Sequence, residues 1–367
     1  MTMSAHESRI PTLASKQAGD ASLSILTGTE PRQVVIDPDG ELHLTVGSLN
    51  GVTFIVCPKT LARASLFWKT LLYGGFAESI QPDRSLGSEW IVKLPADHPK
   101  AMEIFLNIIH SCFDKIPTAV RFCSQVRSIS ILHYKDLYQL TVLTDKYDLT
   151  RILRPWAQNW VKDIDWNFSE YTASAMEFLS WITWELGDKK TFIQVARHII
   201  LASITGPKGV LRLDYRPSKQ LFTCTLEPTG LYGLISDKRL QVIREMLKPV
   251  KAVVTRLLQS DNRNSIIVCT SAKDRTTCDL TMLGAIVRSL TQADLYPIPK
   301  PEGIHISVVQ LADKLKSIDC RSRLHKCNAL PDITTTINRI LQSVGPELTE
   351  THIQHLKAQA EKTGLES

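Results

Sequence analysis

No stretch of this sequence approaches the ~20 consecutive apolar residues that a membrane-spanning helix needs. The first 30 residues have no apolar core behind basic residues, so we expect no secretory signal. The eight cysteines are scattered over 367 residues, without the density of a disulfide-stabilised fold. These absences predict no membrane insertion and a reducing compartment, either the cytoplasm or the nucleus.

Dense basic segments and internal repeats are missing too. The chain has 43 Lys and Arg against 37 Asp and Glu, a net charge of +6, and no short segment is dominated by Lys and Arg. A protein that binds nucleic acid is expected to carry such a patch, so we expect no nucleic-acid partner. No fixed period recurs along the chain, which excludes a solenoid or a propeller.

Residues 37–165 carry clear packing signals and little chemistry. Alternating apolar residues predict strands over 41–46 and 52–56, joined as a hairpin by Asn50-Gly51. A third strand over 90–94 and amphipathic helices complete this block; the helices cover 61–72, 99–109, 137–147 and 149–160, the last one bent or restarted at Pro155. Asp97 is predicted to cap the helix that begins near Pro99. No set of catalytic residues occurs here, which favours a binding module.

These residues resemble the core of a BTB/POZ domain. The resemblance rests on the order and spacing of Phe54 to Pro58, Leu61 to Ser79, Val92 to Pro99 and Leu137 to Asp148. Leu153 to Ala157 is similar to the filamentous-fungal type of this domain, and weaker likeness continues through Trp184 to Asp188 and Cys278 to Leu280.

The resemblance implies an α+β fold, a small sheet flanked by helices, and protein–protein interaction instead of enzymatic activity. The partners that it implies are a second copy of the chain, as a homodimer or homo-oligomerising scaffold, or a cullin scaffold, with the chain as substrate adaptor for a cullin-type ubiquitin ligase. Outward-facing apolar positions on the helices of Ile104 and Leu137 are predicted to form the contact surface. No clear amphipathic helix precedes Leu42, which leaves dimerisation open.

The sequence predicts four segments. Residues 1–36 are rich in Ser, Thr, Ala and Gly and are predicted to be a disordered tail, followed by the BTB/POZ-like domain over 37–165. Helical periodicity predicts a mostly α-helical domain over 166–345, with a joint at Trp166 to Ser169 and a loop-rich interval near 206–230. Residues 346–367 are predicted to be a solvated tail or helix.

A C-x5-R motif, from Cys269 to Arg275, offers an alternative function. A cysteine thiolate at a helix amino terminus can attack phosphorus, and the Arg275 guanidinium can hold phosphate oxygens. The motif is similar to the loop of inositol-polyphosphate 4-phosphatases, which implies a cysteine-dependent phosphatase acting on inositol lipids or inositol phosphates. Such an enzyme needs a sheet to present its loop, with 265–268 as a strand, whereas residues 166–345 predict almost only helices. We therefore expect no enzyme and no catalytic residue.

Five potential soft ligands raise a metal as a second alternative. They are Cys269, Cys278, Cys320, His325 and Cys327. Their spacings, C-x8-C and C-x4-H-x-C, match no recognised zinc pattern, and buried cysteines commonly act as small apolar side chains. The sequence therefore favours no metal and no cofactor, and it leaves open whether these residues gather in space.

Overall fold

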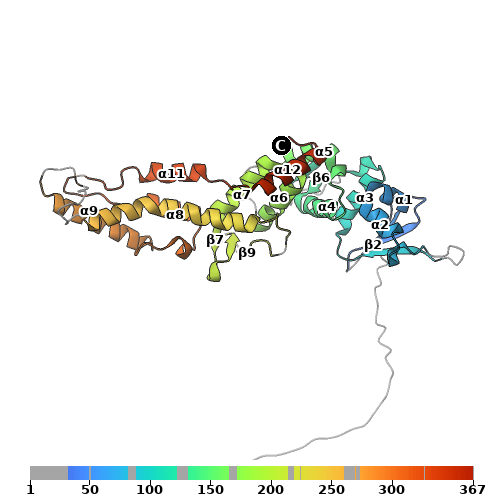
Figure 1. Cartoon of the computed structure of the whole chain (residues 1–367), viewed down its shortest axis with the longest axis horizontal. Helices are drawn as coiled ribbons and strands as arrows, with labels where there is room; N and C mark the ends of the chain where they lie inside the picture. Colours follow the sequence, from blue (N-terminus) through green and yellow to red (C-terminus); the bar gives the residue numbers. More distant parts are fainter. Residues whose placement is uncertain are drawn as a thin grey trace, which may run out of the picture.

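The structure is a computed structural model, and it describes most of the chain. The described residues are 32–48, 51–81, 88–121, 131–164, 172–213, 219–223, 225–259, 269, 273–325 and 327–366. Helices and small sheets alternate along them, which confirms the predicted α+β class. The molecule is elongated, with the amino-terminal sheet at one end and residues 231–343 extending to the other (Figure 1).

A four-stranded sheet forms the amino-terminal end, in the order β1-β3-β2-β4. Its strands are β1 (Gln33–Val35), β2 (Leu42–Val46), β3 (Val52–Val56) and β4 (Trp90–Leu94). The predicted hairpin is confirmed, because β2 and β3 pair antiparallel and alternate buried and half-buried side chains. The predicted tail is wrong for residues 33–35, because these residues pair as a parallel edge strand with β3.

Helices cover this sheet and continue beyond it. They are α1 (Pro58–Ala64), α2 (Leu66–Tyr73), α3 (Pro99–Ile109), α4 (Tyr134–Lys146) and α5 (Arg154–Lys162), with short 3-10 turns η1 (Ala77–Ser79), η3 (Phe113–Lys115) and η4 (Thr150–Leu153). The single helix predicted over 61–72 is two helices, because Ser65 is extended between them. Its hydroxyl accepts the Phe67 N–H and donates to the Tyr147 carbonyl at 2.8 Å.

The predicted cap of α3 is also wrong. His98 caps the helix, and its Nδ1 accepts the Ala101 N–H at 3.4 Å. The buried carboxylate of Asp97 instead accepts from Lys146 Nζ at 2.6 Å and from the Tyr147 hydroxyl. Asp97 therefore joins the start of α3 to the end of α4, an interaction that local sequence cannot reveal.

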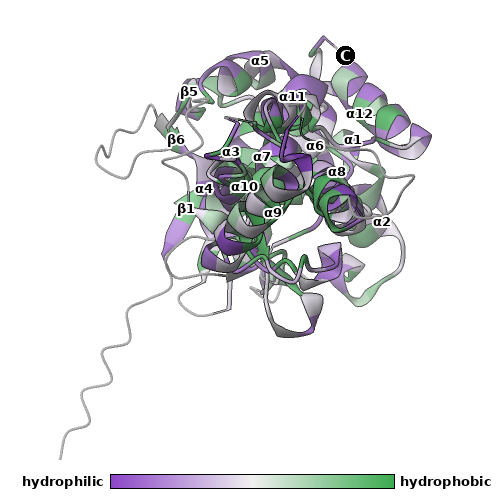
Figure 2. Ribbon diagram, turned by 90° about the vertical axis from the view of Figure 1, so that its left-hand side faces the viewer, coloured by the Kyte–Doolittle hydropathy of each residue, from purple (hydrophilic) through white to green (hydrophobic). Residues whose placement is uncertain are grey.

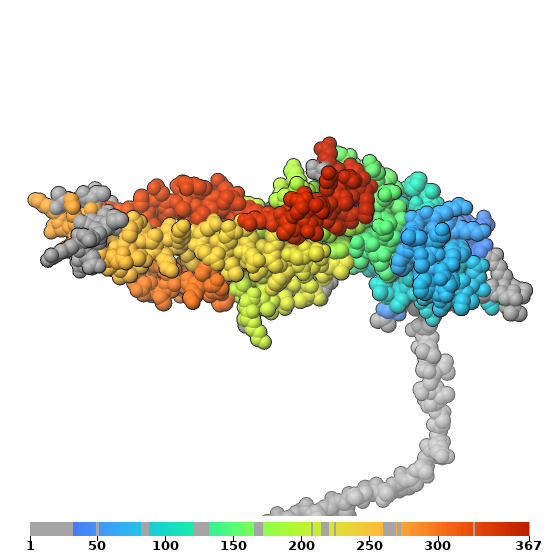
Figure 3. Space-filling model, in the orientation of Figure 1, coloured from blue at the N-terminus to red at the C-terminus, as the bar shows by residue number. Residues whose placement is uncertain are grey.

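Six helices lie in the described residues between 172 and 343. They are α6 (Ala173–Leu186), α7 (Lys189–Ala202), α8 (Leu231–Leu258), α9 (Arg275–Gln292), α10 (Val308–Lys316) and α11 (Ile333–Ser343), with 3-10 turns η6 (Pro207–Gly209) and η7 (Pro301–Gly303). Helix α6 ends at Gly187 (φ 79°), and the side chain of Asp188 caps α7. Helix α8 contacts α9, α10 and α11, and α10 also packs against α11 (Figures 1 and 3).

Two small sheets were not predicted. One is a parallel pair of β5 (Ala119–Arg121) and β6 (Ile131–His133). The other is antiparallel and lies in and just before the interval predicted as loops; it contains β7 (Ser203–Thr205), β8 (Leu211–Leu213) and β9 (Lys219–Gln220). Strands of two or three residues carry too little alternation to be seen in the sequence.

The carboxy-terminal segment is not a solvated end. Residues Glu350–Thr363 form α12, which packs against α6, η4 and α5. Its inner face is buried at Leu356, Gln359, Ala360 and Thr363, and in Figure 2 the helix carries both hydrophobic and hydrophilic residues. The sequence does not predict this buried face, because most residues of the segment are polar.

One continuous set of buried residues runs from Ile36 to Leu356. The core therefore continues across the predicted domain boundary, whose joint at 166–169 lies outside the described residues. None of the helices in the described ranges is long and apolar enough to cross a membrane.

Candidate functional site

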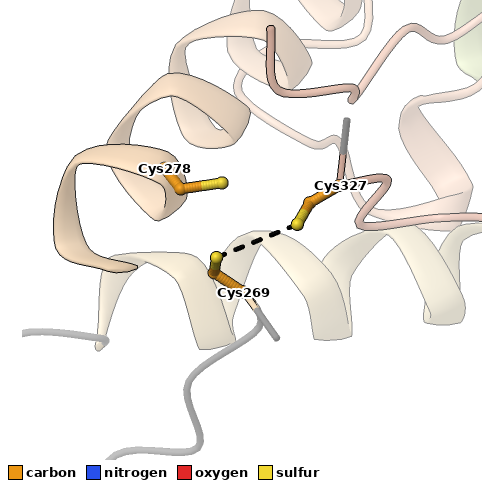
Figure 4. Close-up of side chains that lie close together, drawn as sticks. All are labelled: Cys269, Cys278 and Cys327. Carbon is orange, nitrogen blue, oxygen red and sulfur yellow. Dashed lines mark hydrogen bonds between the residues drawn. The ribbon is translucent and has the colours of Figure 1, made fainter. Parts of the chain in front are cut away.

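Three cysteine side chains and one histidine lie close together beyond α8, at the end of the molecule opposite the amino-terminal sheet. Cys269 follows α8, Cys278 lies in the first turn of α9, and Cys327 lies in the loop before α11 (Figure 4). Their Sγ atoms all lie within 4.8 Å of one another. The Cys269 Sγ is 3.8 Å from the Cys327 Sγ and 3.3 Å from the Nδ1 of His325. His325 and Cys327 lie 56 and 58 positions after Cys269 in the sequence, and both side chains contact it.

The helical periodicity of α9 places Cys278 on the buried face of that helix. Cys278 begins the buried stripe of α9, which continues at four-residue intervals through Met282, Ile286 and Leu290. The next residue, Asp279, is fully buried, and its Oδ1 accepts the Cys269 N–H at 2.9 Å. Helix α9 therefore fixes one ligand directly and positions the backbone of another.

A closed loop before α11 carries His325 and Cys327. The Ala329 N–H donates to the Cys320 carbonyl at 3.3 Å, and the Ser322 N–H donates to the Cys327 carbonyl at 2.7 Å. Cys320 does not join the cluster, because it sits at the base of this loop and its Sγ donates to Asn328 Oδ1 at 2.9 Å. The structure therefore brings together three of the five residues that the sequence singles out as soft ligands, and a fourth, His325, contacts Cys269.

The surroundings of Cys278 change the pKa of its thiol. Burial raises its pKa to about 11, and hydrogen bonds with the neighbouring thiols of Cys269 and Cys327 act in the same direction. A thiol with this pKa is protonated at neutral pH, unless a bound cation displaces the proton.

The C-x5-R motif has a different setting from the one that phosphatase chemistry needs. Cys269 is only 4% exposed and its Sγ faces His325 and Cys327, whereas a nucleophile has to be reached by its substrate. Arg275 is exposed and is the first residue of α9. Residues 270–272 and the predicted strand over 265–268 lie outside the described ranges, and no described strand includes Cys269.

A second feature lies at the opposite end, on the surface of α1, α2 and η1. Large apolar side chains are exposed along one short segment: Leu66 (77%), Phe67, Tyr73, Phe76 and Ile80 (73%). An open groove of about 570 Å³ runs beside them between α1 and α2. It is lined by the apolar Leu66 and Tyr73 and by three bases, with no acid; the bases are Lys59, Arg63 and Lys69.

This surface is not the one that the sequence predicts. Most apolar residues of α3 and α4, including Ile104 and Leu137, are buried in the core, whereas Ile109 and Val142 are half-buried. The sequence predicts Leu66 within one continuous helix. In the structure the helix is broken at Ser65, and Leu66 is exposed at the start of α2. The surface could have been found from the excess of apolar residues over 66–80, which is more than one buried stripe requires.

No family model matches this chain, and no curated protein matches it significantly. The resemblance to BTB/POZ domains therefore stays a prediction from the sequence.

Proposed function

We propose that this chain is a protein–protein interaction module of the BTB/POZ type, which binds a partner along α1, α2 and η1 and has no catalytic activity of its own. The observation that carries this proposal is the row of exposed apolar side chains over 66–80 beside the basic groove. The order of strands and helices along 33–162 supports the domain type.

Exposed apolar side chains of this size are costly unless a partner covers them. Single surface apolar residues are ordinary, but a contiguous group marks an interaction site. Covering one leucine or isoleucine side chain contributes about 1.5–3 kcal/mol. Leu66 and Ile80 are the most exposed members of the row, so a partner gains most at these two positions.

The charge of the groove indicates what kind of partner fits. Lys59, Arg63 and Lys69 line it without an acidic residue among them. In a two-fold homodimer the same surface takes part on both chains, so these three bases would face their own copies wherever the two-fold axis passes through the groove. A different protein that presents acidic and apolar side chains together matches the groove better. The sequence resemblance suggests the amino-terminal domain of a cullin scaffold, with the chain as a substrate adaptor.

Light scattering on the full chain, alone and mixed with the amino-terminal domain of a cullin, tests this proposal. We expect a complex that contains both proteins. Replacing Leu66 and Ile80 together by Ser should weaken it by about 150-fold or more, because at least about 3 kcal/mol of apolar burial is lost over the two positions. Leu258→Ser is the matched control, since Leu258 is 63% exposed on α8, far from the groove.

Two outcomes would contradict the proposal. One is a chain that stays monomeric and ignores the cullin domain. The other is a complex that the double variant and the control affect equally. A dimer of the chain that the double variant abolishes would keep the surface as the binding site but replace the adaptor by a homo-oligomerising scaffold.

A further inference from the structure

We propose that Cys269, Cys278, Cys327 and His325 bind one zinc ion, as three thiolates and an imidazole, and that this ion fastens the far end of the elongated half. The site is independent of the binding surface on α1 and α2. It replaces the sequence-based expectation of no metal.

The distances fit a tetrahedral zinc site. With Zn–S bonds of about 2.3 Å and Zn–N bonds of about 2.0–2.1 Å, tetrahedral angles require S···S separations of about 3.8 Å and S···N separations of about 3.6 Å. The Cys269 and Cys327 sulfurs are 3.8 Å apart, and the Cys269 sulfur is 3.3 Å from the Nδ1 of His325. The Cys278 sulfur lies within 4.8 Å of both other sulfurs. The three sulfurs therefore need only small shifts to surround one ion, and the His325 ring, which contacts the Cys269 sulfur, has to turn toward the other two sulfurs to complete the set.

The chemistry of the ligands favours zinc over harder cations. Three thiolates and one imidazole form a soft donor set, which zinc accepts, whereas magnesium and calcium prefer oxygen. With four protein ligands such a site is closed, without an open position for a substrate. The proposal therefore assigns Cys269 a structural role and leaves it unable to act as a nucleophile.

The surroundings have the arrangement of a metal-bound loop. His325 and Cys327 lie within a closed loop whose backbone bonds join Ser322 to Cys327 and Ala329 to Cys320. Buried Asp279 holds the Cys269 backbone from the neighbouring helix, as residues around metal ligands commonly do. An ion here would link Cys269, the start of α9 and the loop before α11.

A disulfide between Cys269 and Cys327 is the competing use of the same sulfurs. It would need them about 2.05 Å apart and would leave Cys278 and His325 without a function in the cluster. In a zinc site all four converging side chains are used.

Native mass spectrometry of the full chain, purified without chelator and under reducing conditions, tests the proposal. We expect one bound zinc per chain. Cys278→Ser and His325→Ala should each lower zinc affinity by on the order of 100-fold or more, a loss at least as large as that for residues behind metal ligands. Cys320→Ser is the matched control, because Cys320 is buried in the same loop but bonds Asn328; this variant should keep the zinc.

Cobalt titration of the chelated wild-type chain provides a readout that does not depend on the folding of any variant. Thiolate-to-metal charge-transfer absorption that saturates at one equivalent of Co²⁺ would support the site. Any one of three results would overturn the proposal. The chain could contain no zinc, Co²⁺ could produce no charge-transfer absorption, or Cys269 and Cys327 could be joined by a disulfide.

Discussion

Glu185 illustrates at the scale of one residue how distant segments are joined in this molecule. Its fully buried carboxyl accepts from the Thr150 hydroxyl in η4 and from Gln359 Nε2 in α12 at 2.7 Å. Burial raises the pKa of Glu185 to about 8, and the nearby Asp145 adds to the shift. The carboxyl is therefore mostly protonated at neutral pH, which lets it lie in the core without a buried charge.

This raised pKa predicts a pH dependence of stability. Between about pH 4.5 and pH 8, folded Glu185 keeps a proton that the unfolded chain releases. The free energy of unfolding therefore falls as pH rises through this window, by on the order of 3–5 kcal/mol in full. We expect Glu185→Gln to remove this component, as measured by urea unfolding from pH 5 to pH 9.

The comparison between wild type and variant is needed because buried histidines act in the opposite direction. Burial lowers the pKa of His110, His198 and His355, so their contribution to stability grows as pH rises. Subtracting the two pH profiles cancels the histidines. The control Glu245→Gln, at an exposed position of α8, should keep the wild-type profile. Parallel profiles for wild type and Glu185→Gln would refute the assignment.

The cysteine cluster shows what sequence can and cannot predict about a site. The residue types Cys269, Cys278, His325 and Cys327 were visible as potential ligands. Their meeting was not, because it depends on the fold of a loop that is far away in sequence and on the start of α9. Cys320 looks equivalent in the sequence, and only its bond to Asn328 separates it from the others.

At the scale of elements, the sequence predicts best where one face is regularly buried. The alternation in β2 and β3 and the helical periodicity over 99–109 and 137–147 predict their elements directly. Helix α12 was recognised as a segment that could be helical, but its docking on α6 depends on tertiary contacts of Gln359 and Thr363. Polar side chains that are buried by hydrogen bonding look the same in a sequence as exposed ones.

Gly187 gives a test of this docking. It ends α6 with a φ of 79°, and a Cβ there would lie 2.2 Å from the Ala360 backbone nitrogen in α12. Gly187→Ala should therefore lower the free energy of unfolding by about 1–2 kcal/mol for backbone strain, and by at least about 2 kcal/mol more for the clash with α12. Urea unfolding followed by circular dichroism measures the difference.

Gly209 provides the matched control. Its φ is 75°, but a Cβ there would meet nothing within 4 Å. Gly209→Ala should show the backbone cost alone. Equal losses for the two variants would mean that α12 does not lie against Gly187 as described.

At the scale of the whole molecule, the two proposed sites lie at opposite ends. The exposed apolar surface is on α1, α2 and η1, and the cysteine cluster is beyond α8, whose 28 residues span about 42 Å at 1.5 Å per residue (Figure 1). We propose that one end binds a partner, while a zinc ion stabilises the other. Variants at one end should leave the other unaffected, because separate sites with no shared contacts behave additively.

The central claim is that partners bind along residues 58–80, and hydrogen–deuterium exchange tests it most directly. The full chain would be measured with and without the cullin amino-terminal domain. We predict slower exchange over α1, α2 and η1 in the complex, with unchanged exchange in α9, α10 and α11. Protection confined to those distal helices, or no protection of 58–80 in a complex that has formed, would contradict the account.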